Sequence, residues 1–590
     1  MKHKPKLELT WIGKDEQPRL EPRILIEDPE KSYGYKNSGN MLIHGDNLLA
    51  LKALEQDFAG KVKCIYIDPP FNTGARIDAD GKEIGYDDGL EHSEWLNMMY
   101  ARLELLKALL STDGSIFIHI DDTEIAYLIA ICDEIFGRNN RLPIITIKRG
   151  SVTGPKVINP GVVNLSDYII IYAKERLLWK PNRVYRQKQR DSRYSKFILN
   201  RAAPPHEWKF ITLLEAFADF KKVPLKNIRR LNKNEREKEI EAFVLNNAEC
   251  VVRTAALDNS KISKEALELK SLSKKSPGEI FILEREDYEN WYIVNGERIL
   301  FYSDRLSKID GDLVPGELIS NIWDDVLPND LHNEGQVTFK KGKKPEKLIK
   351  RILELATRKG DLVLDSFAGS GTTGAVANKM ERKWILCELS THCDTHALQR
   401  LKRVVNADDQ SGITKDVNWQ GGGGFKYYYL APSLLKQDKY GNWIIDERYN
   451  ANMLAAAMAK HEGFKYSPDE HIYWKQGKST EKDYIFTTTN FITVEFLDKI
   501  NEEMQPDESL LICCKSFSKA CGNRYPNITV KKIPNLLLGR CEFGREDYSL
   551  NIVNMPVEEN NSEPTTPYPS LTKEGSKDGA AKNKKAPRLF

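Results

Sequence analysis

The sequence predicts an α/β fold built on a doubly wound parallel sheet, and three observations support this prediction. Apolar strands alternate with helical periodicity from about Asn40 to about Tyr172, and the same alternation returns from Pro345 to about Val405. In the second stretch a glycine-rich turn joins a strand to a helix. Successive strand and helix units are typical of parallel sheets that carry helices on both faces. We therefore expect both stretches to contribute to one sheet.

Hydrophobic periodicity identifies the elements of each stretch in turn. The first stretch contains an apolar segment MLIHGDN (41–47), a helix LLALKALEQ (48–56), a strand (62–67), a helix WLNMMYARLELLKALL (95–110) and a strand SIFIHI (115–120). The second contains a helix EKLIKRILELA (346–356), a strand DLVLDSF (361–367), the glycine-rich turn, a further helix and a strand KWILCEL (383–389). The order of strands and helices is the same in both.

The domain organisation follows from changes in composition along the chain. Residues 1–173 and 334–430 are predicted to form the two halves of the α/β domain, and residues 174–333 an insert between them. From Arg176 to Arg201 the insert holds nine Lys or Arg and one acidic residue, interleaved with aromatic side chains. Residues 431–556 are expected to form an accessory α+β segment. Residues 557–590 are rich in Pro, Ser, Glu, Asn and Lys and are expected to be disordered.

Composition excludes several classes of protein. The 590 residues are 41% hydrophobic and 29% charged with a net charge of +3, so the chain is neither wholly disordered nor uniformly basic. No apolar run approaches the roughly 20 residues of a membrane span, and we expect a cytoplasmic protein with no membrane partner.

Nine cysteines are irregularly spaced. The spacing of Cys513, Cys514, Cys521 and Cys541 does not fit zinc, so we expect buried thiols and no metal site.

The glycine-rich turn predicts a nucleotide cofactor. In DLVLDSFAGSGTTGAV a strand ends at Asp365, and Gly369, Gly371 and Gly374 follow before a helix. Glycines let a ligand approach backbone N–H groups at a helix N-terminus. The next strand ends at Glu388, where such folds present a carboxylate to ribose hydroxyls. The alternative is a tight strand-to-helix connection that binds no ligand.

The residues of the turn limit which type of cofactor it could bind. A phosphate-binding loop of the G-x-x-x-x-G-K-[ST] type is absent, because Ala375 follows Gly374. Spacing alone leaves a dinucleotide open. S-adenosylmethionine suits the turn better, because it carries a sulfonium and no phosphate that would require a cationic clamp. Asp365 would then face its amino-acid end and Glu388 its ribose.

A second motif, Asp68-Pro69-Pro70-Phe71, follows the apolar strand KCIYI. Two prolines fix the backbone and remove two N–H donors, so the loop presents acceptors. Hydrogen bonds from a base amino group to the Asp68 carboxylate and the Pro69 carbonyl would localise its lone pair and stabilise developing charge. Phe71 would stack on an extruded base. The alternative is a rigid turn after a buried strand.

These two motifs resemble those of the amino-methylating DNA methyltransferases, whose signatures are [DNS]-PP-[YFW] and F-x-G-x-G. The order, with the DPPF loop first, then a basic insert and then the cofactor turn, resembles the permuted β group of that family. The stretches TWIGK, LIHGDNLLAL, DPPFNTG, FIHIDDTE and GGGGFKYYYL resemble the modification (Mod) subunit of type III restriction–modification systems. The resemblance covers about residues 1–430 and continues more weakly to about residue 555. It implies a Rossmann-like methyltransferase sheet in permuted order and makes residues 174–333 a target-recognition domain.

The resemblance also implies roles for individual residues. The residues at the target amine and base would be Asp68, Pro69, Pro70 and Phe71. The residues at the cofactor would be Asp365, Phe367, Gly369, Ser370, Gly371, Thr372 and Glu388, with Lys344 and Pro345 near its methionine end. Asp46 would contact the cofactor adenine, with a helix N-cap as its alternative.

The activity implied is methyl transfer from S-adenosylmethionine to adenine N6 in duplex DNA. Position 68 is Asp, whereas the cytosine N4 enzymes carry Ser there, and this favours adenine as the target. Phe71 departs from the Tyr that is commoner in the adenine enzymes. A cytosine N4 methyltransferase and a DNA-recognition scaffold without activity are the alternatives. The resemblance implies a homodimer and an ATP-driven restriction (helicase/nuclease) subunit as partners.

Six basic residues of the insert are candidates for contacts to DNA phosphates. They are Lys180, Arg183, Arg186, Lys188, Arg190 and Arg193. The alternative is a solvated charged surface. Which bases are read does not follow from the sequence, because base readout depends on the direction of side chains in the groove.

Overall fold

The computed structural model describes residues 8–72, 92–150 and 162–548, apart from residues 287, 310, 328–330, 332, 339–341 and 481. The predicted tail, residues 557–590, lies outside the described residues, as do residues 73–91 that follow the DPPF loop.

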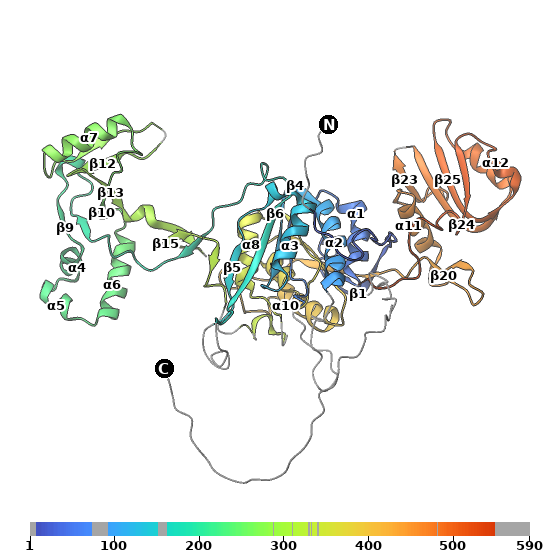
Figure 1. The fold of residues 1–590 in the computed structure, drawn as a ribbon, viewed down its shortest axis with the longest axis horizontal. Coiled ribbons are helices and arrows are strands. Elements are labelled where there is room, and N and C mark those ends of the chain that lie inside the picture. The colour runs from blue at the N-terminus through green and yellow to red at the C-terminus, as the bar shows by residue number, and fades with distance from the viewer. Residues whose placement is uncertain are drawn as a thin grey trace, which may run out of the picture. The chain divides into compact units, whose positions relative to one another are not determined.

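A ten-stranded sheet forms the centre of the fold (Figure 1). Its strands, in spatial order, are β1 (Leu25–Gly34), β19 (Gly424–Leu430), β2 (Met41–His44), β18 (Lys383–Glu388), β17 (Leu362–Asp365), β3 (Val62–Ile67), β4 (Leu110–Ile120), β6 (Ser166–Ala173), β5 (Ile145–Lys148) and β16 (Ile322–Trp323). The six strands from β19 to β4 are mutually parallel. Strands β1 and β6 run antiparallel to their neighbours. The predicted parallel α/β sheet is confirmed, with antiparallel strands added at its edges.

Helices cover both faces of this sheet. They are α1 (Asn47–Phe58), α2 (His92–Leu109), α3 (Ile125–Cys132), α8 (Glu346–Ala356), α9 (Thr372–Lys379) and α10 (Leu398–Asn406). Side chains of β3 alternate between the faces, as strand geometry requires. Cys64 and Tyr66 belong to the core that packs against α8, α9 and α10. Ile65 and Ile67 belong to the core that packs against α1, α2 and α3. This two-sided burial explains why β3 is a continuous apolar run.

Strands β3 and β17 are direct neighbours, although the insert separates them in the chain. They pair in parallel, with Val363 opposite Cys64 and Leu364 opposite Ile65. The carboxyl ends of parallel strands lie at the same edge of a sheet. The DPPF loop after β3 and the glycine-rich turn after β17 therefore start side by side, which confirms that both halves of the chain build one sheet.

The insert has sheets and apolar cores of its own. A six-stranded sheet contains, in spatial order, β11 (Phe281–Leu283), β12 (Trp291–Val294), β13 (Glu297–Phe301), β10 (Val251–Ala256), β8 (Lys196–Ile198) and β9 (Phe210–Thr212). A three-stranded sheet contains β14 (Leu306–Ile309), β15 (Asp312–Leu318) and β7 (Tyr185–Gln187). Its helices are α4 (Leu213–Lys221), α5 (Leu225–Arg230), α6 (Lys233–Asn246) and α7 (Lys264–Lys275). The chain returns to the central sheet at β16, before the predicted end of the insert at residue 333.

The C-terminal segment contains a five-stranded sheet of its own. Its strands are β22 (Lys465–Tyr466), β23 (Gly477–Thr480), β24 (Asp483–Ile492), β25 (Ser509–Phe517) and β26 (Ile528–Lys532), with α11 (Ala451–His461), α12 (Val494–Glu503) and a hairpin of β20 (Leu435–Gln437) and β21 (Trp443–Ile445). Cys513 and Cys514 are buried free thiols on β25. Among the residues that the structure describes, no His, Cys, Asp and Glu cluster could hold a metal ion.

None of the described helices is long and apolar enough to span a bilayer.

A buried ionic cluster connects the three helices on one face of the sheet. Glu346 at the start of α8 accepts from Lys379 of α9 (2.9 Å to Oε2) and from Arg400 of α10 (2.8 Å to Oε1). Lys379 also pairs with Asp409 at 2.7 Å, and all four side chains are inaccessible to solvent. Buried charges are tolerated only when they are paired, so this cluster fixes the start of α8 relative to α9.

Replacement of Lys379 by Met should destabilise the fold strongly. The variant keeps the side-chain volume but leaves Asp409 and one oxygen of Glu346 without their cation. Removing one partner of a buried pair costs about 3–5 kcal/mol. Denaturant unfolding would measure this loss. Lys383→Met, at an exposed position of β18, serves as the control and should change stability by less than about 0.5 kcal/mol. A loss below about 1 kcal/mol for Lys379→Met would contradict the role given to the cluster.

Candidate active site

The DPPF loop is held at the end of β3 by a buried tryptophan. The indole N–H of Trp95 in α2 donates to the carbonyl of Pro70 at 2.6 Å. This contact occupies the Pro70 carbonyl and fixes the loop, so the acceptors expected to face a ligand are the Asp68 carboxylate and the Pro69 carbonyl. The Asp68 side chain is 17% exposed.

A cavity of about 250 Å³ adjoins Phe71. Its lining includes Phe71, His119, Arg149, Asp167, Lys344, Pro345 and Leu348. The volume lies below the range of pockets that hold drug-sized ligands, and it suits one planar ring. The cavity therefore brings the predicted stacking residue of the DPPF loop together with Lys344 and Pro345 from the start of the second half of the α/β domain.

Lys344 contacts both functional side chains of the loop. Its ammonium lies 2.9 Å from Asp68 Oδ1 and 4.9 Å from the centre of the Phe71 ring. The predicted contact of Lys344 with the cofactor stays a prediction. The contact to Asp68 was not predicted.

A chain of polar side chains runs across neighbouring strands of the sheet, and three of its members, His119, Asp167 and Arg149, line the cavity. His119 Nδ1 lies 3.1 Å from the Tyr66 hydroxyl, and His119 Nε2 lies 3.4 Å from Asp167 Oδ2. Arg149 pairs with Asp167 Oδ1 at 3.1 Å. Burial lowers the pKa of His119. Burial alone would raise the pKa of Asp167, but the hydrogen bond and charge of His119, followed by the charge of Arg149, lower it overall.

No site role was predicted for His119, Asp167 or Arg149 from the sequence. A signal was present, because a polar side chain interrupts the apolar strands SIFIHI and SDYIIIYA near one end of each. Polar side chains in buried strands need partners, so two such interruptions on neighbouring strands indicate a shared network.

Asp365 ends β17 as a buried carboxyl with an unusual proton affinity. Its two oxygens accept from the Phe367 N–H (2.9 Å) and the Thr373 hydroxyl (2.6 Å). Burial raises the pKa of Asp365 to about 7; the two hydrogen bonds oppose this shift, and the charges of Asp68 and Glu388 add to it. Perturbed carboxyl groups of this kind are typical of ligand sites.

The glycines of the turn adopt conformations that other residues avoid. Gly369 has φ of +51° and Gly371 has φ of +76°, and a Cβ at Gly371 would meet the Cα of Ala397 at 3.1 Å. Glu388 at the end of β18 accepts from the Gly369 N–H at 2.7 Å. Three of the predicted cofactor residues, Asp365, Gly369 and Glu388, therefore lie together at one edge of the sheet.

Other predicted cofactor residues make structural contacts. Thr372 accepts from Arg400 at 2.7 Å, and Ser370 lies 3.2 Å from Thr372, so their hydroxyls face α10. Phe367 is 9% exposed and packs in the core beside α1 and α2. Contact of these residues with a cofactor stays a prediction.

Asp46 caps the N-terminus of α1, which was its alternative role. Its Oδ1 accepts from the Leu49 N–H at 3.0 Å. Its Oδ2 faces Arg102 at 3.4 Å and accepts from the Tyr548 N–H at 3.2 Å. Both oxygens are thus engaged by the protein, and burial raises the pKa of Asp46 despite the charge of Arg102. The cofactor-adenine contact stays a prediction.

The donors and acceptors of the turn fit S-adenosylmethionine better than a phosphate cofactor. Buried carboxylates at Asp365 and Glu388 would repel phosphate, whereas they can accept from hydroxyl and ammonium groups. Arg400, which donates to Thr372 behind the turn, is neutralised by Glu346. Ser366 Oγ is buried beside Asp365 and has no hydrogen-bond partner within the described ranges. An unpaired buried hydroxyl of this kind suits a ligand contact.

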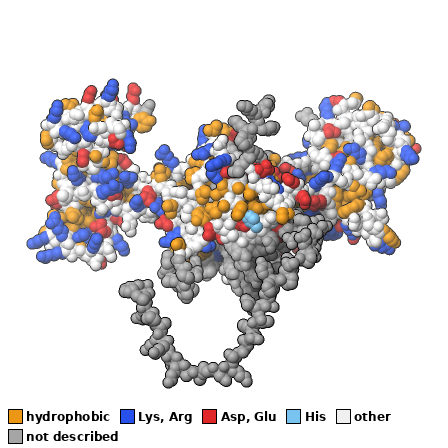
Figure 2. All heavy atoms as spheres, viewed as in Figure 1, with side chains coloured by type: hydrophobic (Ala, Val, Ile, Leu, Met, Phe, Trp, Pro, Cys, Tyr) orange, Lys and Arg blue, Asp and Glu red, His pale blue; other side chains and the backbone are white. Residues whose placement is uncertain are grey.

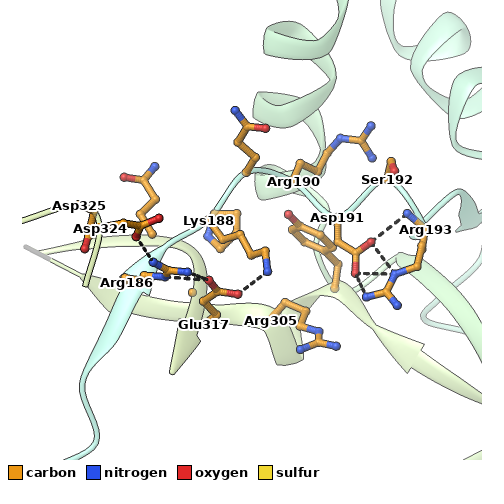
Figure 3. Close-up of a pocket in the computed structure, with 15 residues that line it drawn as sticks. Arg186, Lys188, Arg190, Asp191, Ser192, Arg193, Arg305, Glu317, Asp324 and Asp325 are labelled. Atoms are coloured by element: carbon orange, nitrogen blue, oxygen red, sulfur yellow. Dashed lines mark hydrogen bonds and ion pairs between the residues drawn. The ribbon is translucent and has the colours of Figure 1, made fainter. Parts of the chain in front are cut away.

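The basic residues of the insert are mostly paired with carboxylates. Figure 3 shows Arg186 between Glu317 and Asp324, which it meets at 2.7 and 2.8 Å, and Lys188 directed at Glu317. Arg190 pairs with Glu237 at 2.8 Å and Arg193 with Asp191 at 2.7 Å. The four basic residues line a cavity of about 800 Å³. Lys180 and Arg183 are exposed.

Positive charge is nevertheless common on the insert. Lys and Arg side chains outnumber Asp and Glu on the visible face of the insert (Figure 2). Whether the six predicted residues contact DNA stays a prediction, because in this structure carboxylates already satisfy four of them.

The comparison with known proteins identifies a family. The family described as DNA methylase matches residues 62–397, which include the DPPF loop, the insert and the glycine-rich turn. The chain is 36% identical over 424 residues to a protein of Haemophilus influenzae named as a probable type III restriction-modification HindVI Mod subunit. This match covers 67% of the chain and 54% of that protein. The EcoPI Mod subunit of Escherichia phage P1 is 28% identical over 432 residues, which cover 64% of this chain and 61% of that one.

The chain thus spans about half the length of the curated relatives that it matches. Among solved structures, a putative DNA modification methylase of Thermus thermophilus in complex with S-adenosyl-L-methionine is 15% identical, with a TM-score of 0.30. That match covers 66% of this chain and 99% of the other. The family match includes both strands whose ends carry the DPPF loop and the glycine-rich turn, and it spans more than half of the chain, so the chain belongs to the DNA methylase family.

Proposed function

We propose that this protein transfers a methyl group from S-adenosylmethionine to adenine N6 in duplex DNA, as the modification subunit of a type III restriction–modification system. One observation supports the activity above the others: Asp68 and the glycine-rich turn follow two paired strands, β3 and β17. The site thus has acceptors for an amine beside a turn suited to the methyl donor. The names of the curated relatives support the assignment to a type III system.

The residues of the loop perform separate tasks in this proposal. An adenine extruded from the duplex, at a cost of a few kcal/mol, stacks on Phe71 in the adjoining cavity. Its N6 donates hydrogen bonds to the Asp68 carboxylate and the Pro69 carbonyl, which localise the lone pair on nitrogen. The cofactor supplies an electrophilic methyl group on a sulfonium. The proton lost from N6 goes to Asp68 or to water.

The cofactor residues of the proposal are those that meet at the turn. Glu388 is assigned to the ribose hydroxyls, and Asp365 and Ser366 to the amino-acid end. The Gly369 N–H donates to Glu388 and the Gly371 N–H to the Ala368 carbonyl, so these glycines would contribute by letting the cofactor approach the main chain closely. No metal is assigned to the reaction.

The proposal also covers the role of the insert, the partners and the cellular location. The insert, residues 174–333, is proposed to recognise the target sequence. A homodimer and a helicase/nuclease restriction subunit are proposed partners, on the strength of the likeness to Mod subunits. The proposed location is the cytoplasm, where the protein would act on DNA.

Asp68→Ala should abolish methyl transfer while DNA binding survives. Loss of one transition-state contact of this kind costs about a hundredfold or more in rate. DNA exposed to each protein with labelled cofactor would be digested to nucleosides, which also shows whether N6-methyladenine or N4-methylcytosine carries the label. Asp122→Ala, at an exposed position after β4, is the control. Unchanged methylation by Asp68→Ala would remove Asp68 from the mechanism.

Glu388→Ala should weaken cofactor binding about tenfold to a hundredfold, because hydrogen bonds to charged groups contribute about 1.5–3 kcal/mol. Calorimetry with S-adenosylmethionine measures the affinity directly. Glu381→Ala, on the exposed surface before β18, should bind as the wild type does. Equal affinity in both variants would exclude Glu388 from the site.

Asp365→Asn should stabilise the free protein above neutral pH and weaken cofactor binding. The folded state keeps the Asp365 proton up to about pH 7, whereas the ordinary value is 3.8. Between these values the folded state holds a proton that the unfolded chain has lost, so stability falls as pH rises. The variant lacks this fall and gains up to about 4 kcal/mol at pH 8 over the wild type, with little difference at pH 4.

Thermal unfolding from pH 4 to pH 8 would measure this difference. Asn can still accept from the Phe367 N–H and donate to the Thr373 oxygen, so the local geometry is retained. Asp361→Asn, at the start of the same segment, is the matched control. Parallel stability curves for Asp365→Asn and the wild type would show that Asp365 is not buried with a raised pKa.

A further inference from the structure

We propose that Lys344 is a placeholder for the target amine: its ammonium occupies the position that the amino group of the extruded base must take, and it has to leave before the base can bind. This inference rests on the proposed function. It predicts that Lys344 weakens binding of the target base, whereas a lysine that contacts DNA strengthens binding.

The contacts of Lys344 match those proposed for the amine. Its nitrogen lies 2.9 Å from Asp68 Oδ1 and 4.9 Å from the centre of the Phe71 ring. The side chains of Lys344 and Asp68 are only 15% and 17% exposed. Lys344 therefore places an N–H-bearing nitrogen against the proposed acceptor and over the proposed stacking face, inside the cavity assigned to the base.

Pairing with Lys344 also explains how Asp68 is tolerated in the free protein. Asp68 Oδ1 is buried and makes no hydrogen bond among the described residues, so the ion pair with Lys344 is what compensates its charge. A carboxylate taken from water without a counter-charge is costly. Departure of Lys344 leaves Asp68 without its counter-charge, which keeps the open conformer rare, and the base that then binds supplies N–H donors in place of the ammonium.

The main chain around Lys344 is fixed, so its release is a movement of one side chain. The preceding Lys343 donates to the carbonyl of Val337 at 2.9 Å and also to the carbonyl of Glu334. The following Pro345 has a restricted backbone, and Glu346 is held by Lys379 in the buried ionic cluster. A lysine side chain has four rotatable bonds and changes rotamer rapidly.

The ammonium cannot remain beside the base during the reaction. In the proposal the ammonium, 2.9 Å from Asp68 Oδ1, stands where the N6 nitrogen would lie, and the N6 atom gains positive charge as it takes the methyl group. A neighbouring cation opposes that charge, most strongly where water is excluded. Departure of Lys344 thus removes both a steric and an electrostatic obstacle.

Lys344 should therefore lower the apparent affinity of the protein for an extruded base, and this effect can be measured. When the competent conformer is only partly populated, the apparent affinity falls by that fraction. If Lys344 leaves Asp68 in about one molecule in ten, removal of the ammonium raises apparent affinity for an extrudable base about tenfold. Removal of a lysine that contacts DNA has the opposite effect, because it weakens binding to any duplex.

Lys344→Met tests the inference, because it keeps the length of the side chain and removes the charge. The position of the target base is first mapped in DNA that the wild-type protein has modified. Binding is then measured by fluorescence anisotropy for two labelled duplexes, one with the target adenine and one with an abasic position in its place. We expect Lys344→Met to bind the adenine duplex about tenfold more tightly than the wild type does, and the abasic duplex equally well.

Two further variants control this experiment. Lys347→Met removes a half-exposed lysine from the first turn of α8, three residues after Lys344, and should not favour the adenine duplex. Lys344→Gln repeats the test if the methionine variant fails to fold, which thermal unfolding would show. Equal or weaker binding of the adenine duplex by a folded Lys344 variant overturns the inference. A wild-type protein that modifies no base would instead overturn the proposed function.

Discussion

The parallel pairing of β3 with β17 is the constraint on which the rest of the site depends. Main-chain hydrogen bonds between Cys64–Ile65 and Val363–Leu364 bring together the DPPF loop and the glycine-rich turn, which no local interaction could hold in register. The insert between them closes a long loop, but the entropy of closure grows only slowly with loop length. Because the insert has cores of its own, its size can vary without disturbing the edge of the sheet where both loops begin.

Carboxyl groups lie close together near this edge of the sheet. Asp365 is buried with a raised pKa beside the charges of Asp68 and Glu388, and Lys344 offsets Asp68. Below the turn, the cluster of Glu346, Lys379, Arg400 and Asp409 is fully paired and serves stability. The two groups differ in charge balance: the cluster pairs two carboxylates with two cations, whereas at the edge Lys344 pairs with Asp68 and the buried Asp365 lies near the like charges of Asp68 and Glu388. Locally unfavourable arrangements of this kind are concentrated at functional sites.

Much of the fold and part of the site could be predicted from the sequence. Helical periodicity predicted α8 at 346–356 with the bounds observed, and the strand, glycine and helix pattern predicted the turn after Asp365. These features depend on local sequence. The pairing of Lys344 with Asp68 and the chain from Tyr66 through His119 and Asp167 to Arg149 depend on strand order, which local periodicity does not contain. The same limit explains Asp46: its N-cap role is local, but its contacts with Arg102 and Tyr548 are not.

The insert shows why a run of basic residues does not by itself define a DNA surface. Arg186 and Lys188 share Glu317, and Arg190 and Arg193 each have a carboxylate partner, so the net charge around the larger cavity is much smaller than the sequence suggests. A phosphate group would have to displace these carboxylates, which offsets part of the gain from each contact. Arginines held in such pairs have defined directions, and direction is what base recognition requires, whereas exposed residues such as Lys180 and Arg183 can contribute affinity without sequence preference. The paired and unpaired residues of the insert thus suit different parts of DNA recognition, and paired arginines are the better candidates for reading bases.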